Sequence, residues 1–212
     1  MQGRLIELRP PDDEDFARIS SWISADSPGA AYTGDVAEDV SPERIRQIHT
    51  SGSARYLMIH TATQGAVGAV NWGRRGHSRS YAVAVIIGRH EHWQAGFGAE
   101  AFLRLLDHLF QTLDAWRVEA VTASFNPYTI SAFARQRLTI EGVLRDYFYV
   151  DGEYHDATVW SVLRPEYLEG LARHEAAGFL PYEPLVPVAD KDKAKAELRR
   201  YLAGTPNASW TV

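Results

Sequence analysis

Residues 86–101 read IIGRHEHWQAGFGAEA, so that the end of an apolar run is followed by a polar loop and then by two closely spaced glycines. These glycines, Gly96 and Gly98, open a segment whose apolar residues recur at the spacing of a core-facing helix, from about residue 96 to 114. Glycines at a helix start let the backbone approach a ligand, and the unpaired N–H groups there favour a phosphate. The stretch therefore predicts a strand, a loop and a helix that together bind a phosphate or pyrophosphate.

Other interpretations of the two glycines are open at this point. They satisfy a loose dinucleotide-binding pattern, but that motif places its glycines directly after a strand, whereas here residues 88–95 intervene. A nucleoside-triphosphate loop would need a Gly-Lys-Ser/Thr sequence, which does not follow. Glycines that only cap a structural helix are the remaining alternative.

Apolar runs on either side of this stretch predict the rest of the core. Three strand-like runs precede the loop, and the turn signals between them favour antiparallel hairpins. These runs are residues 55–61, 66–72 and 80–87. After the helix we expect a strand, a second helix and a hairpin, at residues 118–125, 126–137, and 143–150 with 155–163. The order of elements predicts an α/β (α+β) fold.

Both ends of the chain differ from this core. Residues 4–9 predict a first strand, and a helix with an acidic first turn follows. Residues 25–40 are rich in small, turn-forming and acidic side chains, which predicts a mobile loop beside a site. After residue 167 the sequence becomes rich in proline and charge, so we expect a domain at 1–167 and a helical, proline-containing appendage at 168–212.

Composition excludes several classes of protein. The chain has 212 residues, 45% of them hydrophobic, which suffices for a core of its own. It has no cysteine, so disulfides, Cys-ligated zinc and thiol nucleophiles are excluded. The net charge of −5 argues against a nucleic-acid partner. The apolar run at 81–87 is too short to span a membrane, and we expect a soluble, cytoplasmic protein without a membrane partner.

The segment from Trp93 to Gly98 resembles the acyl-CoA signature of the GNAT N-acetyltransferases, Gln/Arg-x-x-Gly-x-Gly/Ala. Trp93 replaces the usual Gln or Arg, as in the branch with spermidine acetyltransferases and ribosomal-protein N-terminal acetyltransferases. Asn126, the sequence EGVLR at 141–145 and the sequence DGEYHD at 151–156 resemble the same branch. The likeness runs from Arg4 to Tyr167 and leaves the tail uncovered.

This resemblance implies a mixed, mostly antiparallel central sheet flanked by helices, which opens near its middle to admit the pantetheine arm of CoA. It implies acetyl-CoA as acyl donor, main-chain contacts along the strand before the loop, and a pyrophosphate on the N–H groups of residues 94–99. The implied cofactor-binding residues are Val85, Ile86, Ile87, Trp93, Gln94, Ala95, Gly96, Phe97, Gly98, Ala99 and Asn126. No metal is expected, because His90 and His92 lack a clear third ligand.

Direct acetyl transfer to an amine needs an acid for the leaving thiolate. Many GNAT enzymes use a tyrosine seven residues after the asparagine, where this chain has Phe133. In the ribosomal-protein branch a serine three residues after the asparagine is thought to serve, and Thr129 occupies that position here. Tyr128 is the neighbouring alternative. The acid is therefore open between Thr129 and Tyr128.

The base and the acceptor site are less specified by the sequence. We expect Asp146 as base, with Glu91, Glu38, Asp39 and His155 as the other candidates. Acidic and aromatic side chains are expected to form the acceptor wall: Glu38, Asp39, Tyr147, Tyr149 and His155.

These expectations leave two functions. The first is an N-acetyltransferase acting on a primary amine of a small molecule or a peptide, with a homodimer suggested by the resemblance. The second is a non-catalytic acyl-CoA-binding regulatory domain, which the phenylalanine at position 133 and the lack of a clear base would favour.

Overall fold

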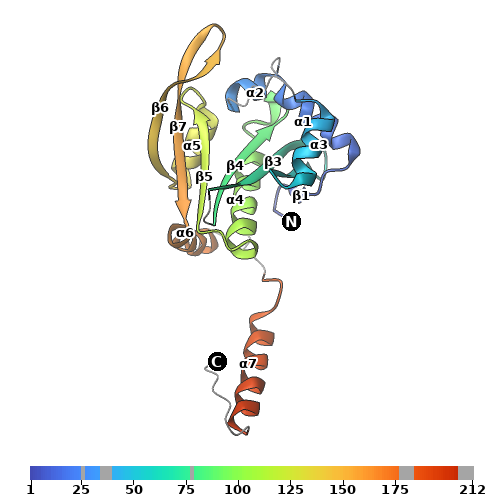
Figure 1. Ribbon diagram of the computed structural model, residues 1–212, viewed down its shortest axis with the longest axis vertical. Helices are drawn as coiled ribbons and strands as arrows, with labels where there is room; N and C mark the ends of the chain where they lie inside the picture. The colour runs from blue at the N-terminus through green and yellow to red at the C-terminus, as the bar shows by residue number, and fades with distance from the viewer. Residues whose placement is uncertain (25–26, 34–39, 77–78, 177–183, 205–212) are drawn as a thin grey trace. The chain divides into compact units, whose positions relative to one another are not determined.

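The computed structural model describes residues 1–24, 27–33, 40–76, 79–176 and 184–204. In this part of the chain a sheet of seven strands has the order β1-β2-β3-β4-β5-β7-β6 (Figure 1). The strands are β1 (Glu7–Arg9), β2 (Arg55–Thr61), β3 (Gly65–Arg75), β4 (Ser80–Ile87), β5 (Arg117–Ala123), β6 (Thr139–Val150) and β7 (Glu153–Leu163). Neighbouring strands are antiparallel except β4 and β5, which confirms the predicted mixed, mostly antiparallel sheet.

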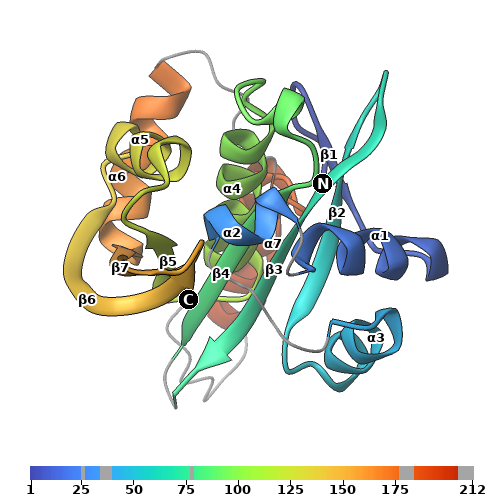
Figure 2. The same ribbon diagram turned by 90° about the horizontal axis from the view of Figure 1, so that it is seen from above.

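Helices cover both faces of the sheet. On one face, α1 (Asp13–Ile23) and α3 (Pro42–Ser51) bury Phe16, Ile19 and Ile45 against β2, and Figure 2 shows the two helices side by side. On the other face, α4 (Phe97–Asp107) and α5 (Pro127–Arg135) pack on the larger cluster of buried residues, which includes Leu105 and Phe133. Because the apolar residues of α4 recur at helical spacing, one face of this helix is buried along its length.

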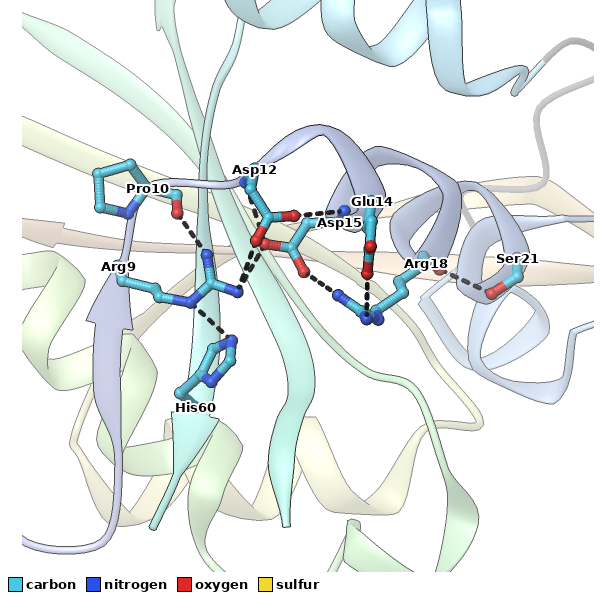
Figure 3. Close-up of polar contacts among 8 residues, drawn as sticks. All are labelled: Arg9, Pro10, Asp12, Glu14, Asp15, Arg18, Ser21 and His60. Atoms are coloured by element: carbon cyan, nitrogen blue, oxygen red, sulfur yellow. Dashed lines mark hydrogen bonds and ion pairs between the residues drawn. The ribbon is translucent and has the colours of Figure 1, made fainter.

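A network of charged side chains fixes α1 to the sheet (Figure 3). Asp12 and Asp15 form a capping box at its start. Asp15 is fully buried and accepts ion pairs from Arg9 at 2.7 Å and Arg18 at 2.6 Å. Burial alone would raise the pKa of Asp15, but the Asp12 N–H and the two guanidiniums outweigh it and lower that pKa. Arg9 Nε also donates to His60 Nε2 at 2.8 Å, so the network joins α1, β1 and β2.

Two predicted segments need correction. Residues 25–40 were expected to form a loop, but residues 28–33 form the helix α2 (Pro28–Thr33). Proline suits a first helical position, and Ala30 is fully buried, so tertiary packing stabilises this short helix. The helix expected over 96–114 ends its α-helical part at Asp107 and continues as a π-helical turn, η2 (His108–Thr112).

The predicted boundary after residue 167 falls within α6 (Arg164–Ala176), which follows β7 directly. Tyr167 stacks on Phe110 at 4.5 Å and donates to Asp107 Oδ1 at 2.8 Å, so the start of α6 belongs to the core. By contacts the chain divides into residues Met1–Leu180 and Pro181–Val212, and the second unit holds α7 (Val188–Ala203). The functional division at 167 stays a prediction.

None of the helices in the described ranges has the length and apolar character that a membrane span requires.

Candidate functional site

The sheet opens between β4 and β5. These parallel strands pair at only three positions, from Ser80 with Arg117 to Ala82 with Glu119. On its other side β4 pairs with β3 over its whole length, from Ser80 to Ile87. The second half of β4 therefore has no strand partner on the β5 side among the described residues. Apart from Ile87 O, which accepts from Trp93 Nε1, its main-chain groups on that side are available to a ligand.

A cavity of about 530 Å³ occupies this opening, and we call it the splay cavity. Its volume is in the range of small-molecule sites. The predicted cofactor-binding and catalytic residues that line it are Val85, Ile86, Ile87, Trp93, Gln94, Gly96, Gly98, Ala99, Asn126, Tyr128 and Thr129. Ala95 and Phe97 are absent from the lining, and Phe97 packs against the core instead.

The start of α4 forms one wall of the splay cavity. Gly96 has a φ of 84°, a left-handed conformation that turns the chain into the helix. No side chain of the described residues caps this end, so the first N–H groups of α4 remain available to an anion. A Cβ at Gly98 would lie 3.4 Å from Ile87 Cγ1, so a side chain there fits the fold but would point into the lining. Trp93 Nε1 donates to Ile87 O at 3.0 Å and fixes the preceding loop.

Asn126 joins two other walls of the cavity. Its side chain is buried, and its Oδ1 accepts from the N–H of Thr129 at 3.0 Å to cap α5. Its Nδ2 donates to Tyr32 O at 2.8 Å and to Thr129 Oγ1 at 3.0 Å. Both amide hydrogens are thus bound within the protein. Because the Thr129 hydroxyl accepts this bond, its own hydrogen remains available to a ligand.

Aromatic rings from three elements meet at the cavity. Tyr32 of α2 lies edge-on to Trp93 at 4.8 Å between ring centroids, and Tyr128 of α5 lies 5.4 Å from Trp93 and 6.0 Å from Tyr32. The rings contact one another and so form a continuous apolar wall between α2, the loop and α5.

Sequence reasoning missed six lining residues of the splay cavity, which are Gly29, Tyr32, Pro127, Ser131, Ala132 and Arg135. Gly29 and Tyr32 come from α2, which the sequence predicted as loop. Arg135 is the one charged lining residue in the described part of the chain. It shares a face of α5 with Tyr128 and Ser131, at a spacing of three and then four residues. That spacing is the signal from which Arg135 was predictable.

Phe133, at the position of the usual tyrosine, lies in the core. It is 6% exposed and its ring lies 5.2 Å from Phe102 and 5.8 Å from Trp160. The residue therefore packs the underside of α5 and lies outside the lining of the splay cavity.

A second cavity, of about 400 Å³, begins where β4 and β5 part, and we call it the sheet-face cavity. It is lined by β3, by residues 82–84 of β4, by residues 119–121 of β5 and by Tyr147 and Phe148 of β6. Tyr147 is the one predicted acceptor residue in this lining within the described ranges.

The remaining predicted residues lie elsewhere. Asp146, Tyr149 and His155 line neither cavity, although His155 contacts Phe125 at 4.8 Å. Asp146 has a φ of 52° at a register shift in β6, and its N–H donates to Asp156 Oδ1 at 2.9 Å. Its assignment as base stays a prediction. Glu38 and Asp39 lie outside the described residues, so the acidic wall also stays a prediction.

Comparison with known proteins agrees with this geometry. Residues 5–138 match the family of GNAT acetyltransferase domains. The chain is 32% identical over 171 residues to the uncharacterised N-acetyltransferase YoaA of Bacillus subtilis, covering 76% of this chain and 94% of that protein. It is 25% identical over 123 residues to spermidine N(1)-acetyltransferase of Vibrio cholerae, covering 58% of this chain and 70% of that protein.

Solved structures show the same fold. The V. cholerae spermidine N-acetyltransferase in complex with CoA and spermine superposes with a TM-score of 0.68 at 21% identity, covering 77% of this chain and 98% of that chain. A GNAT-family acetyltransferase from Bacillus anthracis gives a TM-score of 0.65 at 13% identity, covering 78% and 98%. Together with the family match over residues 5–138, these likenesses show that the chain belongs to the GNAT acetyltransferase family.

Proposed function

We propose that the splay cavity holds acetyl-CoA and that the acetyl group passes directly to a primary amine of a small molecule. The observation that carries this proposal is the unpaired second half of β4 beside the uncapped start of α4. A V. cholerae relative of the same fold was solved with CoA and spermine, which supports an amine acceptor.

The cavity offers complementary groups to each part of the cofactor. The N–H groups at the start of α4 suit the pyrophosphate, because they combine free donors with the positive end of the helix dipole. The main chain of residues 85–87 suits the amides of pantetheine, because it has no strand partner on that side. Arg135 supplies a positive charge to a cofactor phosphate.

The transfer forms one bond and breaks one. The amine nitrogen attacks the thioester carbonyl carbon, the C–N bond forms, and the C–S bond breaks to release the CoA thiolate. Thr129 is placed to donate its hydroxyl hydrogen to the thiolate, since its oxygen already accepts from Asn126 and a hydroxyl that accepts is a stronger donor. Tyr128, which also lines the cavity, is the alternative donor.

The acceptor amine must lose a proton before or during its attack. Asp146 is the proposed base, with Glu91 and His155 as the remaining described candidates. Replacement of Asp146 by asparagine would then lower turnover most at low pH, where less of the free amine is present. A pH–rate profile identical to that of the wild type would assign the deprotonation to another group.

A homodimer and a cytoplasmic location are further parts of the proposal, as is the absence of a nucleic-acid partner in view of the net charge of −5. The homodimer is supported by β6, an edge strand with exposed apolar side chains at Ile140 (50%), Val143 (52%) and Tyr149 (61%). Light scattering tests it: Val143→Lys would shift a dimer toward the monomer.

The decisive experiment measures CoA binding and thiol release separately. Calorimetry gives the Kd for CoA, and thiol release from acetyl-CoA is followed with a panel of primary amines. Arg135→Ala is expected to raise the Kd by about tenfold, the size of one lost charged hydrogen bond, whereas Arg173→Ala on α6 serves as the matched control. CoA binding without release for any amine would favour the non-catalytic domain. An unchanged Kd in Arg135→Ala would remove the phosphate contact.

A further inference from the structure

The sheet-face cavity is lined by the residues of β4 that directly precede those lining the splay cavity. Along β4, residues 85–87 line the splay cavity and residues 82–84 line the sheet-face cavity. The pair Ala82 and Glu119 is the last at which β4 and β5 are joined. In the proposed binding mode, a thioester that enters the opening between the strands would lie beside the sheet-face cavity, where an amine could meet it.

A site for a polycation needs carboxylates that are free to pair with ammonium groups, and the described lining of this cavity does not supply them. Its one carboxylate among the described lining residues, Glu119, is already paired at both oxygens. Oε1 lies 3.3 Å from Arg75 Nε and Oε2 lies 3.1 Å from Arg117 Nη2. A carboxylate shared by two guanidiniums has little attraction left for an ammonium group.

Arg75 itself retains binding capacity. It lines the cavity with its side chain 64% exposed, and its Nε lies 3.3 Å from Glu119 Oε1. A guanidinium carries five N–H donors, more than a single carboxylate can accept, so Arg75 has donors left for a ligand in the exposed part of its side chain. Asn71, half-buried on the neighbouring part of β3, adds an amide group to the same lining. These groups suit a carboxylate or phosphate bound through two parallel hydrogen bonds.

Two more polar side chains, Arg74 and Ser53, line the cavity, and the guanidinium of Arg74 lies over the ring of Tyr81. The remaining lining residues are apolar, and most of them are small. Gly73, Ala82 and Ala84 leave space over the sheet, and the rings of Tyr147 and Phe148, 4.9 Å apart, contribute from β6. A ligand with a flat or apolar body therefore fits between the aromatic side and the arginine.

We propose that the acetyl acceptor of this enzyme carries an acidic group in addition to its primary amine, and that Arg75 binds this acidic group in the sheet-face cavity. The inference rests on the proposed acetyl transfer in the splay cavity. It assigns this chain an acceptor class different from spermine, the ligand in the V. cholerae structure.

Pairs of amines that differ only in the acidic group test the inference. Phenylalanine is compared with 2-phenylethylamine, O-phosphoethanolamine with ethanolamine, and spermine is included as the polycation. For at least one pair we expect kcat/KM to be about tenfold higher for the acidic member, the effect of one charge-assisted contact. The first pair reports on a carboxylate and the second on a phosphate, so the result also identifies the acidic group.

Substitutions assign the preference to the arginine. In Arg75→Gln the ratio of kcat/KM within the preferred pair should fall toward one, and in Arg75→Lys it should fall less. In Glu119→Gln the ratio should rise, because Arg75 loses its competing carboxylate. Arg173→Gln, a charge removed from α6, should leave the ratio unchanged.

The outcomes separate this inference from the proposed function. If in both pairs the non-acidic member is turned over at least as efficiently as the acidic one, or if spermine is turned over more efficiently than both acidic amines, the inference is overturned and the acetyl transfer stands. CoA binding without turnover of any amine would overturn the proposed function. In that case calorimetry on the CoA-loaded protein decides the inference. Tighter binding of the acidic member would support it, whereas equal binding, or none, would overturn it.

Discussion

β4 has two neighbours in the sheet, and it meets them differently. With β3 it forms a ladder from Ser80 to Ile87, whereas with β5 the ladder stops at Ala82. One side of the strand is closed by backbone hydrogen bonds, and on the other side its second half has no strand partner among the described residues. The splay cavity therefore arises where strand pairing ends early, and residues 85–87 of the unpaired half of β4 line it.

Two glycines stand on the two sides of this strand and should respond in opposite ways. A Cβ at Gly68 of β3 would lie 2.2 Å from Ile86 O, so alanine there forces apart the closed ladder. We expect Gly68→Ala to lower the free energy of unfolding by about 3 kcal/mol, the upper range for overpacking. Denaturant unfolding measures it, with Gly142→Ala as control, because a Cβ added there would have no atom of the described residues within 4 Å other than those of its chain neighbours. Equal stability of the two variants would contradict the tight packing of β3 against β4 at Gly68.

Gly98 lines the splay cavity, where a new side chain would interfere with a ligand more than with the packing of the protein. Gly98→Asp is expected to weaken CoA binding by about 100-fold, since a carboxylate at a helix start repels the pyrophosphate while it complements the helix dipole. The free energy of unfolding should stay constant or rise. Calorimetry and denaturant unfolding are measured together, and Gly98→Asn separates the charge from the bulk. Unchanged CoA affinity in the folded aspartate variant would remove the site.

Thr129 tests whether the open side also serves the chemistry. Thr129→Val removes the hydroxyl and keeps the shape, so turnover should fall about tenfold while CoA affinity changes little, because the lost bond forms mainly in the transition state. Thr129→Ser keeps the hydroxyl and should retain most turnover. The comparison requires a single-turnover measurement in which chemistry limits the rate. If valine and serine variants react equally fast, the role passes to Tyr128 or water.

The sequence predicted the start of α4 in the splay cavity better than it predicted α2, which lines the same cavity. The glycine spacing and the apolar period of residues 96–114 predicted the helix start that lines the splay cavity, because local backbone geometry and helix amphipathicity are encoded by neighbouring residues. Gly29 and Tyr32 were not predicted, because α2 is a short helix that is stabilised by the burial of Ala30 and by the hydrogen bond between Asn126 and Tyr32. Such distant contacts leave no periodic trace in the sequence.

The acceptor side was harder to predict for a related reason. The pairing of Glu119 with Arg75 and Arg117 joins two strands that are far apart in the sequence. In the sequence Glu119 is one acid among 27, and nothing local distinguishes it. Asp146 was chosen as base from strand alternation, but a register shift between Leu144 and Phe148 interrupts that alternation.

The smallest effect is expected far from the splay cavity, where α1 packs beside β1 and β2 at the β1 edge of the sheet (Figure 3). His60 accepts from Arg9 Nε, and burial, together with the charge of Arg9, lowers its pKa. Unfolded His60 then binds a proton that the folded protein does not, so stability falls as the pH drops below about 6.5. The lowered pKa of Asp15 acts only below its ordinary value of 3.8, outside this range.

Burial also lowers the pKa values of His49 and His108, so they contribute to the same pH dependence. The test is therefore a difference between variants. His60→Gln keeps an acceptor for Arg9 and removes the titration, so its Tm should fall less than that of the wild type between pH 7.5 and pH 5.5, by about 2 °C. Parallel Tm profiles would mean that the Arg9 bond adjusts to a charged His60. The contacts of α1 with β1 and β2 would then be less rigid than their hydrogen bonds indicate. This part of the sheet would differ less from the unpaired side of β4.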